Sequence, residues 1–219
     1  MRIHNGRPGT VRSPRQGFTL IELLVVIFII SLLVSILLPS LAAVRNEARR
    51  IRCAANLRSF GQSFQLYMND NKEVLPYVLP FHQSNLPSNP NDPSLLQVLE
   101  GYISSDLPYY DDTGRLVVTE PFLCPSDDQG LGKETGFSYE YWAGSLMIAR
   151  EIFRFDPQPA RTVTRFYEGN PTFPVLADAG QFHKAGGRQY NQNALYFGDW
   201  RADWLELDPE SFGPDSVGP

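Results

Sequence analysis

The sequence predicts an α+β protein in which a long N-terminal helix packs on a small head built around an antiparallel β-sheet. Three observations support this fold class: an apolar run over residues 18–38, helical spacing of apolar residues over 40–71, and short β-rich patches separated by Gly, Asp and Pro further on. The chain has 219 residues, of which 42% are hydrophobic. This length and composition predict one buried core in the head.

The composition also excludes several classes of protein. A formal net charge of -5 argues against a surface that wraps nucleic acid, and 17 Gly and 18 Pro argue against a purely helical chain. The two cysteines, Cys53 and Cys124, are too few for a disulfide scaffold or a four-thiolate zinc site.

The N-terminus differs in character from the rest of the chain. Residues 1–17 contain four arginines and no acidic residue, and the apolar run 18–38 follows directly. Its only polar side chains are those of Thr19, Glu22, Ser31 and Ser35. At about 1.5 Å per residue the run makes roughly 31 Å of helix, which matches a hydrocarbon core of about 30 Å. The sequence therefore predicts a basic leader and a membrane-spanning helix.

A second helical stretch is expected beyond the span. Pro39 removes the hydrogen bond to the carbonyl of Ser35 and predicts a kink or local melting there. Residues 40–71 contain no further proline, and Asn69-Asp70-Asn71 marks the end of the helix.

Two apolar stripes with helical spacing follow this second stretch. The first comprises Leu41, Val44, Ala48, Ile51 and Ala55, and the second comprises Cys53, Leu57, Phe60, Phe64 and Tyr67. The stripe centres lie roughly 160° apart at about 100° per residue. We expect the first stripe to face neighbouring helices in an assembly and the second to rest on the head. A third direction around the helix is occupied by Arg45, Arg49 and Arg52. These arginines form either a solvated face or a contact for lipid headgroups or for acidic groups of another subunit.

The head contains signals for a loop, a short helix and several strands. Residues 72–93 are predicted to form an extended loop, and Asp92-Pro93-Ser94 begins a helix. Strands are expected at 116–119, 138–142, 162–167, 174–177, 193–197 and 200–205. Gly198-Asp199 predicts a two-residue hairpin turn between the last two strands.

The junction from Arg15 to Val26, with Gly17 before Phe18 and Glu22 inside an apolar helix, resembles the processing site of type IV prepilins and type II secretion pseudopilins. The resemblance implies cleavage after Gly17 by a prepilin peptidase, which also methylates the new amine of Phe18. It also implies that the leader lies in the cytoplasm and that all residues after Pro39 lie outside the cytoplasm. Charge counting alone leaves this orientation open, because arginines also follow the span.

The same resemblance implies a division of the chain and a location. Residues 1–17 are a cleaved leader, 18–38 a transmembrane and assembly helix, 39–71 its aqueous continuation, and 72–219 the globular head. Before assembly the chain is a single-pass protein of the inner membrane with its head in the periplasm, and it then joins a filament. The implied partners are the prepilin peptidase, other pilin or pseudopilin subunits, the inner-membrane assembly platform and the lipid bilayer.

The charged side chain of Glu22 is energetically unfavourable inside the apolar run 18–38. A carboxylate in a membrane helix costs about 2.5–3.5 kcal/mol on insertion scales, so it is normally paired or neutralised. In the resembled family this glutamate meets the N-terminal amine of a neighbouring subunit and aligns it with the filament. The alternative is a glutamate near the helix start that snorkels to the interface and is favoured by the helix dipole.

The cysteines are expected to form a disulfide. The implied topology puts Cys53 and Cys124 outside the cytoplasm, where disulfides persist, and Cys53 lies on the stripe assigned to the head. The alternative is a buried pair of unbonded cysteines. The resemblance to a subgroup of pilin-like proteins extends to the run Cys53 to Arg58, to Cys124-Pro125 and to the hairpin after His183, where the family's Asp-Gly order is reversed.

No enzyme is predicted. The chain lacks a Gly-x-Ser-x-Gly elbow, a phosphate-binding loop and a His-Glu-x-x-His motif, and His82 and His183 are assigned to loops. No cofactor is expected; the candidate for calcium is a site of Asp178, Asp199 and Asp203, since some pseudopilins bind calcium near the C-terminus, although the spacing is not that of an EF-hand.

The sequence thus predicts a structural subunit of a type II secretion pseudopilus or type IV pilus-like filament. Loss of the leader leaves 15 basic and 24 acidic residues, so no nucleic-acid partner is expected. The alternative is a membrane-anchored extracytoplasmic binding or enzymatic domain that uses a pilin-type anchor.

Overall fold

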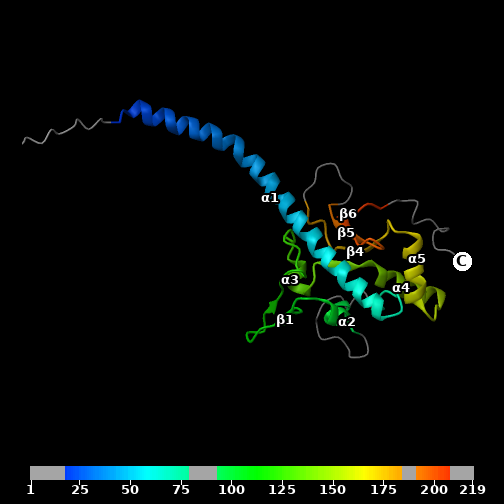
Figure 1. Ribbon diagram of the computed structural model, residues 1–219. Coiled ribbons are helices and arrows are strands. Elements are labelled where there is room, and N and C mark those ends of the chain that lie inside the picture. The colour runs from blue at the N-terminus through cyan, green and yellow to red at the C-terminus, as the bar shows by residue number, and fades with distance from the viewer. Residues whose placement is uncertain (1–17, 79–92, 184–190, 208–219) are drawn as a thin grey trace, which may run out of the picture. The chain divides into compact units, whose positions relative to one another are not determined.

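A computed structural model describes residues 18–78, 93–183 and 191–207, and its elements confirm the predicted α+β class (Figure 1). The chain divides into two compact units, residues 1–43 and 44–219. Helix α1, Leu20–Asp70, runs from the first unit into the second and ends where the Asn-Asp-Asn sequence predicted.

The first unit contains the apolar part of α1. This is one stretch that is long and apolar enough to cross a membrane. The helix continues through Pro39 without interruption, so local melting is not seen there, and a kink at Pro39 stays a prediction. Ser35 and Ser40 donate their hydroxyl protons to the carbonyls of Leu32 and Leu37, which keeps these polar groups bonded within the helix.

In the second unit the second stripe of α1 forms one side of the core. Cys53, Leu57, Phe60 and Phe64 are completely buried, and Tyr67 is half-buried. Residues of the first stripe, in contrast, are exposed, as the two-stripe pattern predicted. The helix therefore uses one face for its own head and leaves the other uncovered.

Aromatic rings fix α1 on the head. The Phe60 ring meets the edges of Phe122, Phe137 and Tyr139 at centroid distances of 5.9, 5.3 and 5.8 Å. Phe64 stacks between the rings of Tyr141 and Trp200, at 5.5 and 5.6 Å. Each such pair stabilises the fold by about 0.5–1.5 kcal/mol beyond the stabilisation that comes from burying the rings.

Close approach of the helix requires Gly61. A Cβ at this position would lie 2.8 Å from the Cβ of Trp200, so a side chain would push α1 away from the last hairpin. The indole Nε1 of Trp200 donates to Oε1 of Gln65 at 2.7 Å, which ties the same hairpin to the helix.

The head contains a four-stranded antiparallel sheet in the order β3-β4-β5-β6. Its strands are β3 (Tyr139–Tyr141), β4 (Pro174–Asp178), β5 (Asn193–Tyr196) and β6 (Ala202–Trp204). The register pairs Tyr139 with Asp178, Leu176 with Leu195 and Ala194 with Asp203. A separate two-stranded ribbon joins β1 (Tyr109–Tyr110) to β2 (Leu116–Val117).

The hairpin between β5 and β6 exists, but its turn is longer than predicted. The amide of Tyr196 bonds the carbonyl of Arg201, so residues 197–200 form the loop, and both Gly198 and Trp200 have positive φ. Trp200 tolerates this backbone conformation because its ring packs on Phe64.

The short helix after the loop begins as predicted. Ser94 caps α2 (Leu95–Leu99) in a capping box with Gln97, and the 3₁₀ turn η2 (Glu100–Tyr102) follows. Most of the predicted 72–93 loop, including His82, lies outside the described residues.

Three helices of the head were not predicted: α3 (Leu131–Thr135), α4 (Trp142–Arg154) and α5 (Pro159–Gly169). The predicted strand at 162–167 is wrong, because these residues lie within α5. Pro159 occupies the first turn, and Val163 and Tyr167, four residues apart, are buried on one face. Burial on a helical face has outweighed the strand preference of Thr, Val, Phe and Tyr.

The packing of aromatic rings around Phe60 predicts that substitutions at two positions of α1 change the free energy of unfolding by very different amounts. Phe60→Ala should lower the free energy of unfolding by about 3–5 kcal/mol, because it leaves a cavity among three rings. Leu66→Ala, at a side chain that is 52% exposed, should change it by less than about 0.5 kcal/mol. Urea unfolding followed by circular dichroism measures both, and equal effects would contradict the packing described.

Candidate assembly helix and its supporting cluster

The first turn of α1 is closed by Thr19 and Glu22. Oε2 of Glu22 accepts the amide of Thr19 at 2.8 Å and its hydroxyl at 2.7 Å, and the amide of Glu22 donates to Oγ1 of Thr19 at 3.3 Å. This reciprocal pattern is a capping box, which the spacing Thr-x-x-Glu could have predicted. Among the described residues Oε1 of Glu22 has no hydrogen-bond partner, so the carboxylate can accept a second donor.

The surface that follows Glu22 is apolar on every side. All large hydrophobic side chains from Leu20 to Leu38 are exposed, from 44% at Val34 to 78% at Leu20. Such a helix is stable in lipid or among other helices, because water would have to solvate the whole apolar surface. Phe18, which precedes it, is 76% exposed, and Gly17 lies outside the described residues.

Comparison with known proteins singles out this segment. Residues 12–38 match the family model described as the prokaryotic N-terminal methylation motif. The chain thus carries a type IV pilin-like N-terminal segment. It is 43% identical over 56 residues to the type IV wide pilus major component PilA4 of Thermus thermophilus. This similarity covers 26% of the present chain and 43% of the length of that pilin. No solved structure matches the chain.

Beyond the pilin-like segment, the first stripe and the arginines of α1 lie on the surface. Val44 is 64% exposed and Ile51 is 56% exposed. Arg52 lies 3.8 Å from Glu120, and both side chains are exposed, so this pair adds little to stability. Arg50, which follows Arg49 in the sequence, instead covers the Trp204 ring at 4.5 Å.

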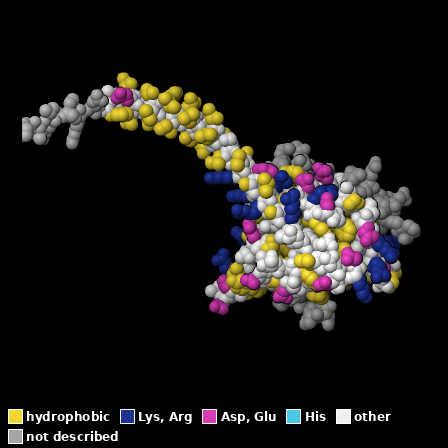
Figure 2. Space-filling view, viewed as in Figure 1, with side chains coloured by type: hydrophobic (Ala, Val, Ile, Leu, Met, Phe, Trp, Pro, Cys, Tyr) yellow, Lys and Arg dark blue, Asp and Glu magenta, His cyan; other side chains and the backbone are white. Residues whose placement is uncertain are grey.

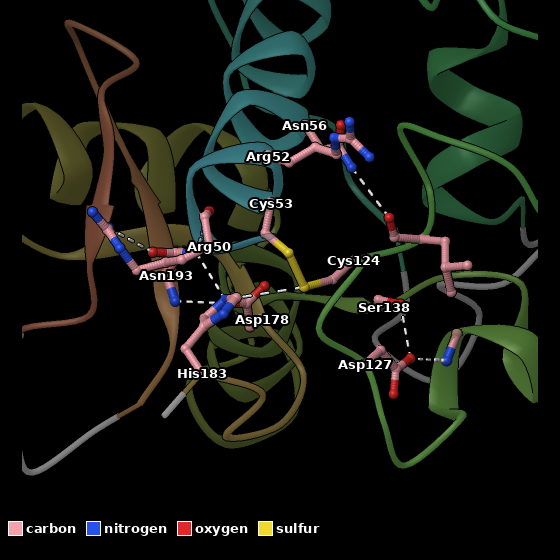
Figure 3. The surroundings of a disulfide bond; sticks show 12 residues. Arg50, Arg52, Cys53, Asn56, Cys124, Asp127, Ser138, Asp178, His183 and Asn193 are labelled. Atoms are coloured by element: carbon pink, nitrogen blue, oxygen red, sulfur yellow. Dashed lines mark hydrogen bonds and ion pairs between the residues drawn. A yellow bond between two sulfur atoms is a disulfide. The ribbon is translucent and has the colours of Figure 1, made fainter. Parts of the chain in front are cut away.

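A disulfide joins α1 to the head in the structure, between Cys53 and Cys124 (Figure 3). Both residues are buried, and Cys124 lies in the loop before Asp127, whose carboxylate accepts the amides at the start of α3. Amide Nδ2 of Asn56, on the next turn of the same helix face, donates to the carbonyl of Leu123 at 3.1 Å. The bond therefore lies within a packed contact between helix and loop.

A buried polar cluster lies beside the disulfide, and sequence reasoning missed it. Nε2 of His183 lies 2.9 Å from Oδ2 of Asp178, and the backbone amide of Asn193 donates to the same oxygen at 2.6 Å. The side-chain amide of Asn193 donates to the carbonyl of Arg50 on α1 at 3.3 Å. Burial raises the pKa of Asp178, while the hydrogen bond from His183 opposes that rise. The cluster ties β4, β5 and α1 together, and His183 belongs to the loop to which the sequence assigned it, although its side chain is buried.

This cluster does not have the geometry of a catalytic triad. Nε2 of His183 faces both the sulfur of Cys124, at 4.0 Å, and the carboxylate of Asp178, whereas a triad uses the two ring nitrogens for separate partners. The sulfur is also bonded to Cys53, which removes the thiolate that nucleophilic attack or metal ligation needs. The geometry of the cluster suits a structural role.

The three aspartates of the calcium candidate are not brought together as a ligand set. Asp178 is engaged by His183 and Asn193 inside the head, Asp199 bonds Arg201 at the exposed hairpin loop, and Asp203 accepts the amide of Trp204. In the ranges that the structure covers, the one cluster with metal-ligand spacing comprises Cys53, Cys124 and His183.

The disulfide can be tested by its effect on stability. The double variant Cys53→Ala/Cys124→Ala should lower the free energy of unfolding by about 4 kcal/mol, because it frees a loop of 71 residues in the unfolded chain. Wild-type protein unfolded with a reductant should lose a similar amount. Peptide mapping without reduction should recover the linked peptides, and recovery of two alkylated thiols would contradict the bond.

Proposed function

We propose that this chain is a structural subunit of a pilus-like filament, either a type II secretion pseudopilus or a type IV pilus. The observation that carries the proposal is the pilin-like segment 12–38, which joins a methylation motif to an uncovered apolar helix with Glu22 in its first turn. The similarity to a pilus component from Thermus thermophilus over 56 residues supports it.

The exposed helix favours assembly over simple anchoring. A lone anchor needs an apolar surface but no carboxylate, because the charge costs about 2.5–3.5 kcal/mol in the membrane. In a filament the apolar surface of 18–38 packs on neighbouring helices, and the carboxylate finds a partner. The same helix thus serves as a membrane anchor before assembly and as filament core afterwards.

Glu22 has an oxygen available for that partner. While Oε2 caps the helix through Thr19, Oε1 is open to the terminal ammonium group of Phe18 from a neighbouring copy. Pairing would neutralise both charges in a medium of low dielectric constant. Capping and alignment are therefore compatible roles for one carboxylate.

Processing follows from the same segment. A prepilin peptidase would remove residues 1–17 on the cytoplasmic side and methylate Phe18, leaving the head outside the membrane. The mature formal charge is then -9, since the leader contains four arginines and no acid.

We expect mature protein to begin at N-methylated Phe18, with Met1 and the leader absent. Gly17→Leu should block cleavage because a bulky side chain crowds the extended scissile segment. Intact-mass spectrometry of membrane and filament fractions gives both results. Assembled protein that retains Met1 would contradict the proposal.

Replacement of Glu22 should separate insertion from assembly. Glu22→Gln keeps an acceptor for the Thr19 amide but removes the charge, so membrane insertion and cleavage should persist while incorporation into sheared filaments falls about tenfold or more. Thr19→Ala is the matched control, since it removes the hydroxyl from the cap and leaves the charge. Equal incorporation of Glu22→Gln and wild type would exclude the pairing role. A processed, membrane-bound chain that never enters filaments would instead favour the anchored binding or enzymatic domain.

A further inference from the structure

The head carries two exposed aromatic surfaces with opposite charge. The first, the α4–α5 corner, comprises Ile152, Phe153, Arg154, Phe155, Arg161 and Arg165. The second, the β1–β2 tip, comprises Asp106, Tyr109, Tyr110 and Asp112. Figure 1 places the two surfaces at opposite edges of the head, and Figure 2 shows basic side chains over α4 and α5 and acidic side chains at the β1–β2 ribbon.

The apolar side chains of the corner contribute little to the core. Ile152 is 58% exposed, Phe153 is 78% exposed and Phe155 is 87% exposed. Three neighbouring large apolar side chains at one helix end form a patch of the kind that marks an interaction site. Beside it lies a groove lined by Tyr77, Pro157 and Arg161, among others.

Phe155 also occupies an unfavourable backbone conformation. It ends α4 with φ 50° and ψ 39°, the left-handed position at which helices usually place glycine. Trp200 shares this conformation, but its ring stacks on Phe64 and thereby compensates for the strain. Phe155 has no such burial, so its own fold gives no reason for an aromatic residue there.

The charges of the corner are predominantly positive. Residues 150–165 contain four arginines and two acidic residues. The acids are engaged within the chain, because Asp156 pairs with Arg150 at 3.6 Å and Glu151 accepts the Tyr77 hydroxyl. Among the described residues Arg154, Arg161 and Arg165 make no ion pair, so the corner presents unmatched positive charge.

The β1–β2 tip has the complementary character. Residues 106–115 contain three aspartates and one arginine, and Tyr109 and Tyr110 are 56% and 49% exposed. Asp111 organises the turn by accepting the Thr113 hydroxyl and the amides of Arg115 and Thr113, and these bonds, the hydroxyl's first, hold its pKa below the usual range. The tip is therefore a fixed acidic and aromatic projection.

We propose that the β1–β2 tip of one copy docks on the α4–α5 corner of the next. The two surfaces lie at opposite edges of one head, so they cannot meet within a molecule. A contact between unlike surfaces of successive copies generates a ring where the rotation closes and an open helical assembly where it does not, and a filament uses the second case. Tyr109 and Tyr110 would pack against Phe153 and Phe155, with Asp106 and Asp112 facing the unmatched arginines. This inference rests on the proposed filament function and assigns the head its own contact in addition to α1.

Charge reversal and its compensation test the contact in full-length protein expressed as the sole copy. Arg161→Glu/Arg165→Glu should reduce the amount of chain in sheared filaments about tenfold, and the added pair Asp106→Arg/Asp112→Arg should restore it to within about threefold of wild type. Arg58→Glu/Arg201→Glu makes the same change of charge outside both surfaces and should leave incorporation unchanged.

Phe155→Gly distinguishes a contact residue from a structural one. Glycine suits the left-handed position, so the Tm of the detergent-solubilised chain should rise by about 2 °C while filament incorporation falls about tenfold. A fall in both quantities would overturn the contact role.

The outcomes separate this inference from the proposed function. Absence of wild-type chain from filaments would overturn both. Incorporation of wild type, Phe155→Gly and the charge-reversed variant to the same level would overturn the head contact alone, and would leave the corner as a surface for another partner such as an anionic membrane.

Discussion

The exposed apolar surface of residues 18–38 sets the main physical requirement on this chain, because it must be covered. Its large side chains are between 44% and 78% exposed in the isolated chain, so lipid or other protein must cover them. In the proposed function a membrane covers this helix before assembly, and helices of neighbouring subunits cover it in the filament. Glu22 distinguishes the two environments, because its charge is unfavourable in lipid and can be matched only by a group from outside its own helix turn.

The head contacts only one face of α1. Phe60 and Phe64 insert between rings of the head, and the Cys53–Cys124 bond and the Asp178–His183–Asn193 cluster fix the same helix face. The opposite face, which includes Val44 and Ile51, stays uncovered. Because the head holds only one face of residues 44–70, the other face is available to neighbouring subunits in the proposed filament.

Local signals predicted the elements that local chemistry determines. The stripes of α1 and the Ser94 capping box follow from spacing, and the disulfide was expected from topology and the position of Cys53. The strand predicted at 162–167 was wrong because the side chains there suit a strand, and the helix depends on the packing of Val163 and Tyr167 on the core. The burial of His183 and the four-residue loop before β6 depend on partners far along the chain, so sequence spacing could not show them.

Cryo-electron microscopy of filaments sheared from cells that express this chain would show whether the chain is a filament subunit. We expect a core of α1 helices from successive copies that begin at Phe18, with Glu22 inside the core and each head still packed on its helix around Phe60. Filaments built without this chain, with the chain recovered only as a membrane-bound monomer, would contradict this expectation.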